Sequence, residues 1–183
     1  MLTPDRRNQL IDALGEAQRI GMLGAGDVGV AVDQAVRLAE LIPAEVSNFL
    51  DVGSGGGVPG LVIAEARPDL QGVLVDRREK RVDLLVRLIG RLGLRSRVEA
   101  LACDVEDLPR RFPGRLWPVV TARGFGSPAY TVDLVVPLLS PDGCLLVTEP
   151  PGSAGDRWRI PAEEHGIVLD GVVDGVAILR RPG

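Results

Sequence analysis

Aromatic side chains, cysteine and lysine are all scarce in this chain of 183 residues. Aromatics make up 3% of it, so the core has to be built from Leu, Val, Ile and Ala rather than from rings. The two cysteines, Cys103 and Cys144, match no metal or redox spacing. This spacing argues against a disulfide framework and a metal site, and it predicts two small buried hydrophobes.

Long apolar runs are also missing. No stretch approaches the roughly 18 apolar residues that a membrane-spanning helix needs, and residues 1–7 move directly into charged residues instead of a signal-peptide core. We therefore expect a cytoplasmic protein without a membrane partner. The length and an apolar fraction of 45% predict a single autonomously folding domain.

Positive charge comes almost entirely from arginine, because Lys80 is the only lysine. Arginine suits bidentate contacts with phosphate, but the same bias can reflect genome composition. The net charge of −4 gives no overall attraction to nucleic acid, although a local basic face can coexist with it. Charge alone leaves the partner open.

Two helices are predicted before the first strand. A hydroxyl, a proline and an acid at residues 3–5 form a helix start, and this helix should run to about Gln18. A second helical periodicity covers residues 32–42. We expect residues 1–45 to form a helical prelude that packs on a core made by residues 46–183.

After this prelude, short apolar runs alternate with longer amphipathic segments, which is typical of a parallel sheet wrapped by helices. The predicted strands are Asn48 to Val52, Gly72 to Asp76, Val98 to Ala102, Pro118 to Ala122 and Cys144 to Thr148. The predicted helices between them are Val58 to Ala66, Glu79 to Arg91 and Ala129 to Leu139. The fold class is therefore α/β, a Rossmann-like, mostly parallel sheet with helices on both faces.

The end of the chain differs from this alternation. A segment rich in proline and glycine, residues 149–162, predicts that the helix expected there is replaced wholly or partly by a loop. Two apolar runs, residues 166–173 and 176–181, flank Asp174 and Gly175. This pattern predicts a C-terminal antiparallel hairpin.

The pattern G-x-G-x-x-G occurs twice, at residues 24–29 and at residues 55–60. Such a loop binds a nucleotide only where a strand enters it, a helix leaves it and a carboxylate follows on the next strand to hold the ribose hydroxyls. Residues 16–23 suit a helix end better than a strand, yet an NAD(P)-dependent oxidoreductase using the first pattern, with Asp51 on the ribose, stays an alternative. The second pattern follows a convincing strand, and Asp76 closes the next one.

An acid two residues before the first glycine, Asp51, separates the second loop from most dinucleotide fingerprints. The run Asp-Val-Gly-Ser-Gly-Gly-Gly matches the acidic-x-Gly-x-Gly-x-Gly form found in methyltransferases. A tight turn with no ligand is the competing structural interpretation. We predict S-adenosylmethionine as the cofactor, with loop residues Asp51, Gly53, Ser54, Gly55 and Gly57.

Three segments together resemble a known family. They are LDVGSGGGVPG from Leu50, LVDRREKR from Leu74 and TARGFGS from Thr121. They are similar to the glucose-inhibited division protein B family, the small-subunit rRNA methyltransferase G enzymes that methylate a guanine of 16S rRNA at N7. The resemblance covers about residues 48–146. It implies a class I methyltransferase fold, S-adenosylmethionine, and 16S rRNA or the small ribosomal subunit as partner.

The resemblance also implies roles for individual residues. Gly53 and Val58 fall where the family's loop contacts the methionine part of the cofactor. Val105 and Glu106 match the pair that lies along the adenine. Arg123 matches the arginine at the mouth of the site, where it would meet cofactor or substrate, and it is the one catalytic candidate.

The chain departs from the family's pattern in two places. Val30 occupies the position of a family histidine, and Glu149 with Pro150 follows the fifth strand where the family usually has Leu-Lys-Gly. An acid in place of a phosphate-facing lysine would weaken RNA binding. A small molecule or peptide therefore stays an alternative acceptor.

The two acceptor hypotheses predict different surroundings. The rRNA hypothesis places Arg123 and the arginines at 91, 95 and 97 near phosphates, whereas a small acceptor predicts an enclosed apolar pocket by Phe125 and residues 150–151. Either way the sulfonium methyl is already activated, so in-line transfer needs no obligatory general base. We expect His165, the single histidine, to be incidental.

Overall fold

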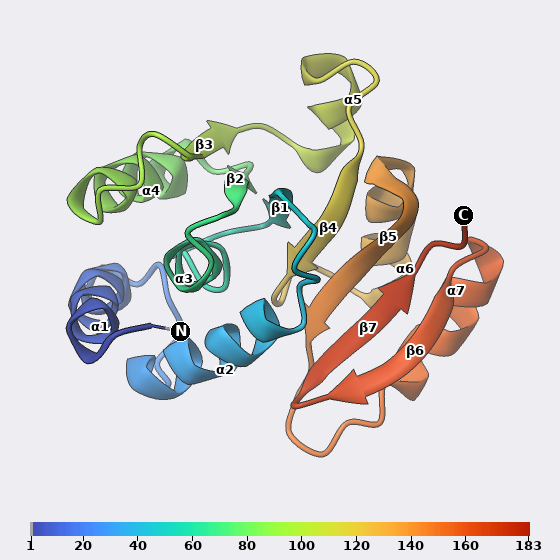
Figure 1. The fold of residues 1–183 in the computed structure, drawn as a ribbon, viewed down its shortest axis with the longest axis horizontal. Helices are drawn as coiled ribbons and strands as arrows, with labels where there is room; N and C mark the ends of the chain where they lie inside the picture. Colours follow the sequence, from blue (N-terminus) through green and yellow to red (C-terminus); the bar gives the residue numbers. More distant parts are fainter. Residues whose placement is uncertain (1) are drawn as a thin grey trace.

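The computed structural model describes residues 2–183. Within these residues the strands form one sheet in the order β3-β2-β1-β4-β5-β7-β6 (Figure 1). The strands are β1 Asn48–Val52, β2 Gln71–Asp76, β3 Val98–Ala102, β4 Trp117–Ala122, β5 Leu139–Thr148, β6 Val168–Val173 and β7 Val176–Arg180. Neighbours among β1 to β5 are parallel, whereas β7 is antiparallel to both β5 and β6. The predicted mostly parallel sheet and its C-terminal hairpin are confirmed.

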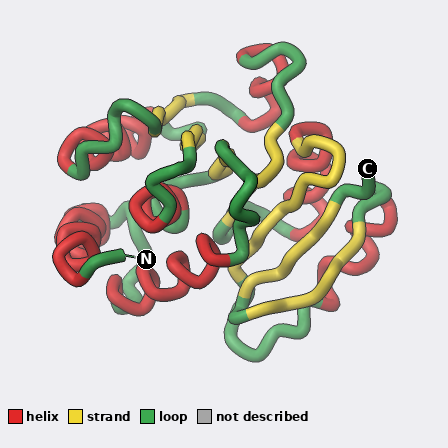
Figure 2. Tube along the Cα trace, viewed as in Figure 1, coloured by secondary structure: helices red, strands yellow, loops and turns green. Residues whose placement is uncertain are grey.

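Helices cover both faces of this sheet (Figures 1 and 2). One buried cluster joins residues of the first four helices, and the second cluster joins residues of the last three. The helices are α1 Pro4–Arg19, α2 Val28–Glu40, α3 Gly60–Ala66, α4 Glu79–Arg91, α5 Leu108–Arg111, α6 Pro128–Val135 and α7 Arg159–Glu164. None of the helices in residues 2–183 combines the length and apolarity needed to cross a bilayer.

The two N-terminal helices begin at capping side chains. The Thr3 hydroxyl accepts from the Arg6 amide at 3.3 Å, as the predicted helix start requires. The Asp27 carboxylate accepts from the Val30 amide at 3.0 Å, and it starts α2 four residues before the predicted periodicity. Sequence periodicity missed this turn because its first residues are only partly buried or exposed.

The strongest boundary error lies between α6 and β5. The predicted helix to Leu139 stops at Val135, and a short 3-10 turn with Pro137 follows, because proline cannot donate to the preceding turn. β5 then pairs with β4 at Leu139 and again from Cys144, and the pairing is irregular between these two positions. Asp142 in this segment has φ of +59°.

Helix α4 matches its predicted bounds. Val86 on this helix is 48% exposed although it is apolar. Arg87 and Arg91 lie 3.6 and 3.4 Å from the Glu16 carboxylate of α1. These pairs link α4 to the N-terminal helix.

Candidate functional site

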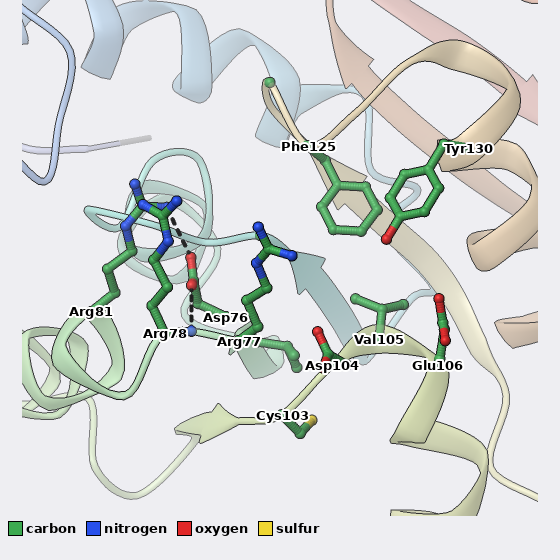
Figure 3. Close-up of a pocket in the computed structure, with 13 residues that line it drawn as sticks. Asp76, Arg77, Arg78, Arg81, Cys103, Asp104, Val105, Glu106, Phe125 and Tyr130 are labelled. Carbon is green, nitrogen blue, oxygen red and sulfur yellow. Dashed lines mark hydrogen bonds and ion pairs between the residues drawn. The ribbon is translucent and has the colours of Figure 1, made fainter.

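The carboxyl ends of β1, β2, β3 and β4 surround a cavity of about 440 Å³ (Figure 3). β1 lies between β2 and β4. The chain continues from β1 to β2 and β3 on one side, and the connection from β3 then crosses to β4 on the other side. Such a switch point is where open α/β sheets bind their ligands. The cavity is lined by Gly53, Val75, Asp76, Arg77, Arg78, Arg81, Cys103, Asp104, Val105, Glu106, Gly124, Phe125 and Tyr130.

The second glycine loop joins β1 to α3 at one wall of this cavity. Gly53, Gly55 and Gly57 have φ of +67°, +55° and +102°, a region that favours glycine. A Cβ on Gly53 would also lie 2.7 Å from Cδ2 of Phe125. Glycine is therefore required where the loop approaches the cavity.

Asp51 lies beneath the loop and has no exposed surface. Its Oδ1 accepts from the Thr121 hydroxyl at 2.6 Å, and its backbone carbonyl accepts from the Ser54 hydroxyl at 2.9 Å. Burial raises the pKa of the Asp51 carboxyl to about 6, although the Thr121 hydrogen bond opposes this shift. The structure thus places Asp51 and Ser54 as internal supports of the loop.

Of the six residues predicted around the loop, Gly53 is the one that lines the cavity in the described part of the chain. Val58 is 6% exposed and belongs to the core on the helical side of the loop. The Gly55 amide points to the Asp76 carboxylate, with its nitrogen 3.0 Å from Oδ2. Val58 and Gly55 therefore hold the loop in shape without lining the cavity.

Asp76 connects the loop to the end of β2. It is 4% exposed, and besides Gly55 it accepts from the Arg78 amide at 2.9 Å and from Arg81 at 3.3 Å. A carboxylate offers about four acceptor positions, so these three donors leave room for a ribose hydroxyl. Asp76 lines the cavity, where the sequence predicts the ribose.

Val105 and Glu106 form the next part of the wall, in a 3-10 turn directly after β3. Val105 is 6% exposed and presents an apolar surface, whereas Glu106 is exposed. Cys103 beside them is half-buried, while Cys144 is buried, so the prediction of two buried cysteines is right only for Cys144.

Arg123 lies next to the cavity rather than in its wall. It lines an adjoining hollow of about 370 Å³, which shares Gly124 and Phe125 with the first cavity. Within residues 2–183 no carboxylate lies within ion-pair distance of Arg123, and burial lowers the pKa of its guanidinium. A half-buried cation without a counter-charge is suited to an anionic ligand.

Glu149 faces the same hollow but is neutralised internally. Its carboxylate accepts from Arg157 Nε at 3.0 Å and from Trp158 Nε1 at 2.8 Å, and also from the Ser153 hydroxyl. Burial opposes ionisation, but hydrogen bonds from Arg157, Ser153 and Trp158 outweigh it and lower the pKa of Glu149. Glu149 therefore does not present a free carboxylate to an RNA phosphate. The hollow contains Phe125 and residues 150–151, as a small acceptor predicts, but Arg123, Glu149 and Arg157 also line it, so it is not purely apolar.

The arginines at 91, 95 and 97 do not join Arg123. Arg91 pairs with Asp12 and Glu16 of α1. Arg95 and Arg97 line a separate hollow with Gln71 and Val98, the first residues of β2 and β3. They therefore lie at the amino ends of the strands, opposite to the cavity. The structure does not bring them together with Arg123, because α4 runs back along the sheet, and their place near RNA phosphates stays a prediction.

Arg77 and Arg78 are the exposed arginines at the cofactor cavity (Figure 3). No role was predicted for them, although they directly follow Asp76. Phe125 was expected at the pocket of a small acceptor, and it lines both this cavity and the adjoining hollow. Tyr130 was not predicted in the cavity wall, and only the rarity of aromatic residues in this chain could have drawn attention to it.

The first glycine pattern lies in the connection between α1 and α2. No strand enters it, and Gln18 Nε2 donates to the carbonyls of Gly24 and Gly26 at 2.7 and 2.6 Å. The oxidoreductase alternative lacks the strand that its fingerprint needs. His165 contacts the Pro161 carbonyl at 3.0 Å, away from the residues that line the cavity.

Known proteins of similar sequence belong to the family that the three segments resemble. The sequence model of the family described as "GidB: rRNA small subunit methyltransferase G" matches residues 31–150. A ribosomal RNA small subunit methyltransferase G of Acidothermus cellulolyticus is 34% identical over 171 residues, covering 87% of this chain and 69% of the relative. One of Sorangium cellulosum is 38% identical over 56% of this chain. This chain spans 43% of the Sorangium relative, less than half its length.

Solved structures share the fold. An O-methyltransferase from Bacillus cereus in complex with SAH has a TM-score of 0.70 at 16% identity, with 95% of this chain and 90% of that one covered. A methyltransferase from Geobacter sulfurreducens has a TM-score of 0.68 at 14% identity, with 99% and 92% covered. At 14 to 16% identity, this similarity shows a shared fold and nothing about the acceptor.

Proposed function

Because the chain belongs to the rRNA small subunit methyltransferase G family, we propose that it transfers a methyl group from S-adenosylmethionine to N7 of a guanine in 16S rRNA. Membership confirms the predicted class I methyltransferase fold and the cofactor. The proposal rests on one observation: Gly53 of the glycine loop, Asp76 and the pair Val105 and Glu106 line a single cavity.

The cavity fits the cofactor in size and in chemistry. Its volume of about 440 Å³ lies within the usual range of small-ligand sites. Asp76 has acceptor capacity left for ribose hydroxyls, and Val105 offers an apolar contact for an adenine. Gly53 allows a close approach of the backbone, as the methionine end requires.

S-adenosylmethionine supplies a methyl group that its own sulfonium already activates. The protein then has to hold the acceptor in line, about 3 to 3.5 Å from that carbon. The N7 lone pair forms the new bond as the carbon–sulfur bond breaks, and the positive charge passes from sulfur to the purine. No proton moves, so this acceptor requires no general base from the protein.

Charged side chains around the mouth suit an RNA acceptor. Arg123 can bind a phosphate bidentately beside the reacting nucleotide. Arg77 and Arg78 are exposed at the cavity and form no ion pair within residues 2–183, so they are available to phosphates, although Asp104 and Glu106 line the same cavity. A salt titration should therefore show binding to small-subunit rRNA that weakens steeply with ionic strength.

A two-stage experiment tests the proposal. Calorimetry with S-adenosylhomocysteine measures the cofactor site, and incubation with undermethylated small ribosomal subunits, followed by nuclease digestion and mass spectrometry, measures 7-methylguanine. Arg123→Ala should keep cofactor binding and lose most transfer, whereas Arg110→Ala, whose side chain is 81% exposed outside both cavities, should keep both. Cofactor binding without any transfer to these subunits would refute the acceptor.

The proposal also covers organisation and location. Residues 1–45 and 46–183 would form one domain, which is supported by a buried cluster that joins α1 and α2 to α3 and α4. Limited proteolysis should then give no stable fragment of residues 46–183. Action on the small ribosomal subunit would place the protein in the cytoplasm.

A further inference from the structure

The six aromatic side chains of this chain have an uneven distribution. Phe49, Trp117 and Trp158 are at most 1% exposed. Phe112 packs edge-on against Trp117, with ring centroids 5.7 Å apart. The remaining two, Phe125 and Tyr130, leave the core and line the cofactor cavity.

Phe125 and Tyr130 form a stacked pair (Figure 3). Their ring centroids are 5.7 Å apart and their planes are inclined by 27°. Phe125 is packed closely against Gly53, and a Cβ on Gly126 would lie 2.6 Å from Tyr130 Cδ1. Two glycines therefore make room for the rings, which indicates a packed arrangement rather than loose surface side chains.

The backbone that carries Tyr130 is held in place, while part of its ring is exposed. The Ser127 hydroxyl accepts from the Tyr130 amide at 3.3 Å and caps α6, so Tyr130 stands in the first turn of a helix. Tyr130 is nevertheless 46% exposed. A rigid, half-exposed ring next to a ligand cavity favours a flat aromatic ligand, because every nucleobase has a face that can stack on it.

The position of the pair distinguishes between the two bases that the reaction brings together. Asp76 and the pair Val105 and Glu106 line the side assigned to the cofactor's adenosine. Phe125 lies against Gly53, where the methionine end is expected, and it also lines the hollow of Arg123. Phe125 thus lies between the methyl donor and the unpaired cation, and the Tyr130 ring stacked on it lines the cofactor cavity together with Val105 and Glu106.

We propose that Phe125 and Tyr130 form the stacking platform for the methyl-accepting base, which enters the site as a single unpaired or flipped purine. Tyr130 contacts the face of this base, and Arg123 binds the adjoining phosphate. This inference rests on the proposed function, and it adds where the acceptor base lies and that it must leave its own stack.

Substitution of Tyr130 separates acceptor binding from cofactor binding. Tyr130→Ala should raise KM for undermethylated small subunits about 5- to 100-fold, as expected for one lost base–aromatic stack, and leave S-adenosylhomocysteine affinity within about twofold. Tyr130→Phe should restore KM, because the ring and not the hydroxyl carries the contact. Leu116→Ala, a similarly exposed apolar residue outside the cavity, is the matched control.

Three results would overturn the platform. They are an unchanged KM in Tyr130→Ala, an equal loss of S-adenosylhomocysteine affinity, which would assign the rings to the cofactor, and failure of Tyr130→Phe to rescue.

A second readout does not depend on methyl transfer. Because Tyr130 is the only tyrosine, fluorotyrosine labelling gives a protein with one ¹⁹F signal from this ring. With S-adenosylhomocysteine at saturation, guanosine 5′-monophosphate should shift that signal, and Arg123→Ala should weaken the titration. A shift without transfer to ribosomal subunits would keep the platform and refute the proposed acceptor, whereas no shift would refute the platform itself.

Discussion

The two G-x-G-x-x-G segments have the same pattern and different structures. In the second, β1 enters and α3 leaves, and Gly55 and Gly57 have positive φ. In the first, a helix lies on each side, and neither Gly24 nor Gly26 has positive φ or an atom within 4 Å of a Cβ position. The strand before the pattern decides its use, because it delivers the backbone to the sheet edge.

The connection that carries the first pattern also touches the second loop. A Cβ on Gly56 would lie 2.7 Å from the Met22 carbonyl oxygen and 3.1 Å from the Leu23 Cβ, just before the first pattern. Residues 22–23 therefore pack on the cofactor loop and help to support it.

Alanine at the third glycine of each pattern, Gly60 and Gly29, should give the largest difference in the free energy of unfolding. In Gly60→Ala the new Cβ would lie 2.6 Å from Asp51 Oδ2 and 2.9 Å from Leu74 Cγ, both fully buried. We expect a loss of about 3 kcal/mol in the free energy of unfolding, the upper part of the usual range for overpacking. Urea denaturation measures it.

Gly29→Ala is the matched variant. It lies in the first turn of α2, and the nearest atoms, at 3.0 and 3.4 Å, are the ends of the Asp27 and Arg7 side chains, which need to shift by only a few tenths of an ångström. Alanine should stabilise this helix by up to about 1 kcal/mol. Equal losses in both variants would show that the second loop is no more constrained than the first.

Asp51 gives a second contrast, since the oxidoreductase alternative would place it on a ribose. Its pKa of about 6 in the folded protein is above the ordinary 3.8, so the folded state binds this proton more tightly. The stability from this group is complete below about pH 4 and is lost as the pH rises through about 6, by roughly 2 to 3 kcal/mol.

Asp51→Asn should therefore gain roughly 2 to 3 kcal/mol relative to the natural chain between pH 4 and pH 7. Urea unfolding at several pH values measures this difference, and Asp83→Asn, at an exposed position of α4, is the control. Parallel stability curves for Asp51→Asn and the natural chain would mean that Asp51 is solvated.

Local patterns were enough to predict most of the sheet and the cofactor loop. β1, β3 and α4 match their predicted bounds, because each is a short apolar or amphipathic run between clear breaks. The order of Gly53, Asp76 and Glu106 along the chain also predicted that successive parallel strands would bring them to one edge. Parallel strands carry such residues to the same end of the sheet.

Contacts between distant segments could not be predicted in this way. The pairing of Glu149 with Arg157 depends on how residues 150–156 fold back, and that of Arg91 with Glu16 depends on how α1 docks. Charge and spacing in one segment do not specify a partner in another. For the same reason Asp51 was expected at the ligand and lies beneath the loop.

Alanine variants of Gly53 and Gly93 distinguish an effect on ligand binding from an effect of backbone strain alone. Both have positive φ, +67° and +73°, but only Gly53 has a close neighbour, Phe125. Alanine at either position should destabilise the protein by about 1 to 2 kcal/mol. Calorimetry should show that Gly53→Ala also weakens S-adenosylhomocysteine binding about tenfold, because its Cβ displaces Phe125, whereas Gly93→Ala leaves it unchanged. Equal binding by both variants would remove Gly53 from the site.

The smallest effect is expected where the first pattern is erased. The double variant Gly24→Ala with Gly26→Ala adds two methyl groups into open space and keeps the backbone carbonyls that Gln18 binds. The free energy of unfolding should stay within about 0.5 kcal/mol, as for surface changes. S-adenosylhomocysteine should raise the melting temperature of both proteins equally, and NAD should raise neither. Stabilisation of the natural chain by NAD, lost in the double variant, would restore the first pattern as a nucleotide site, since only a ligand at those glycines would be sensitive to them.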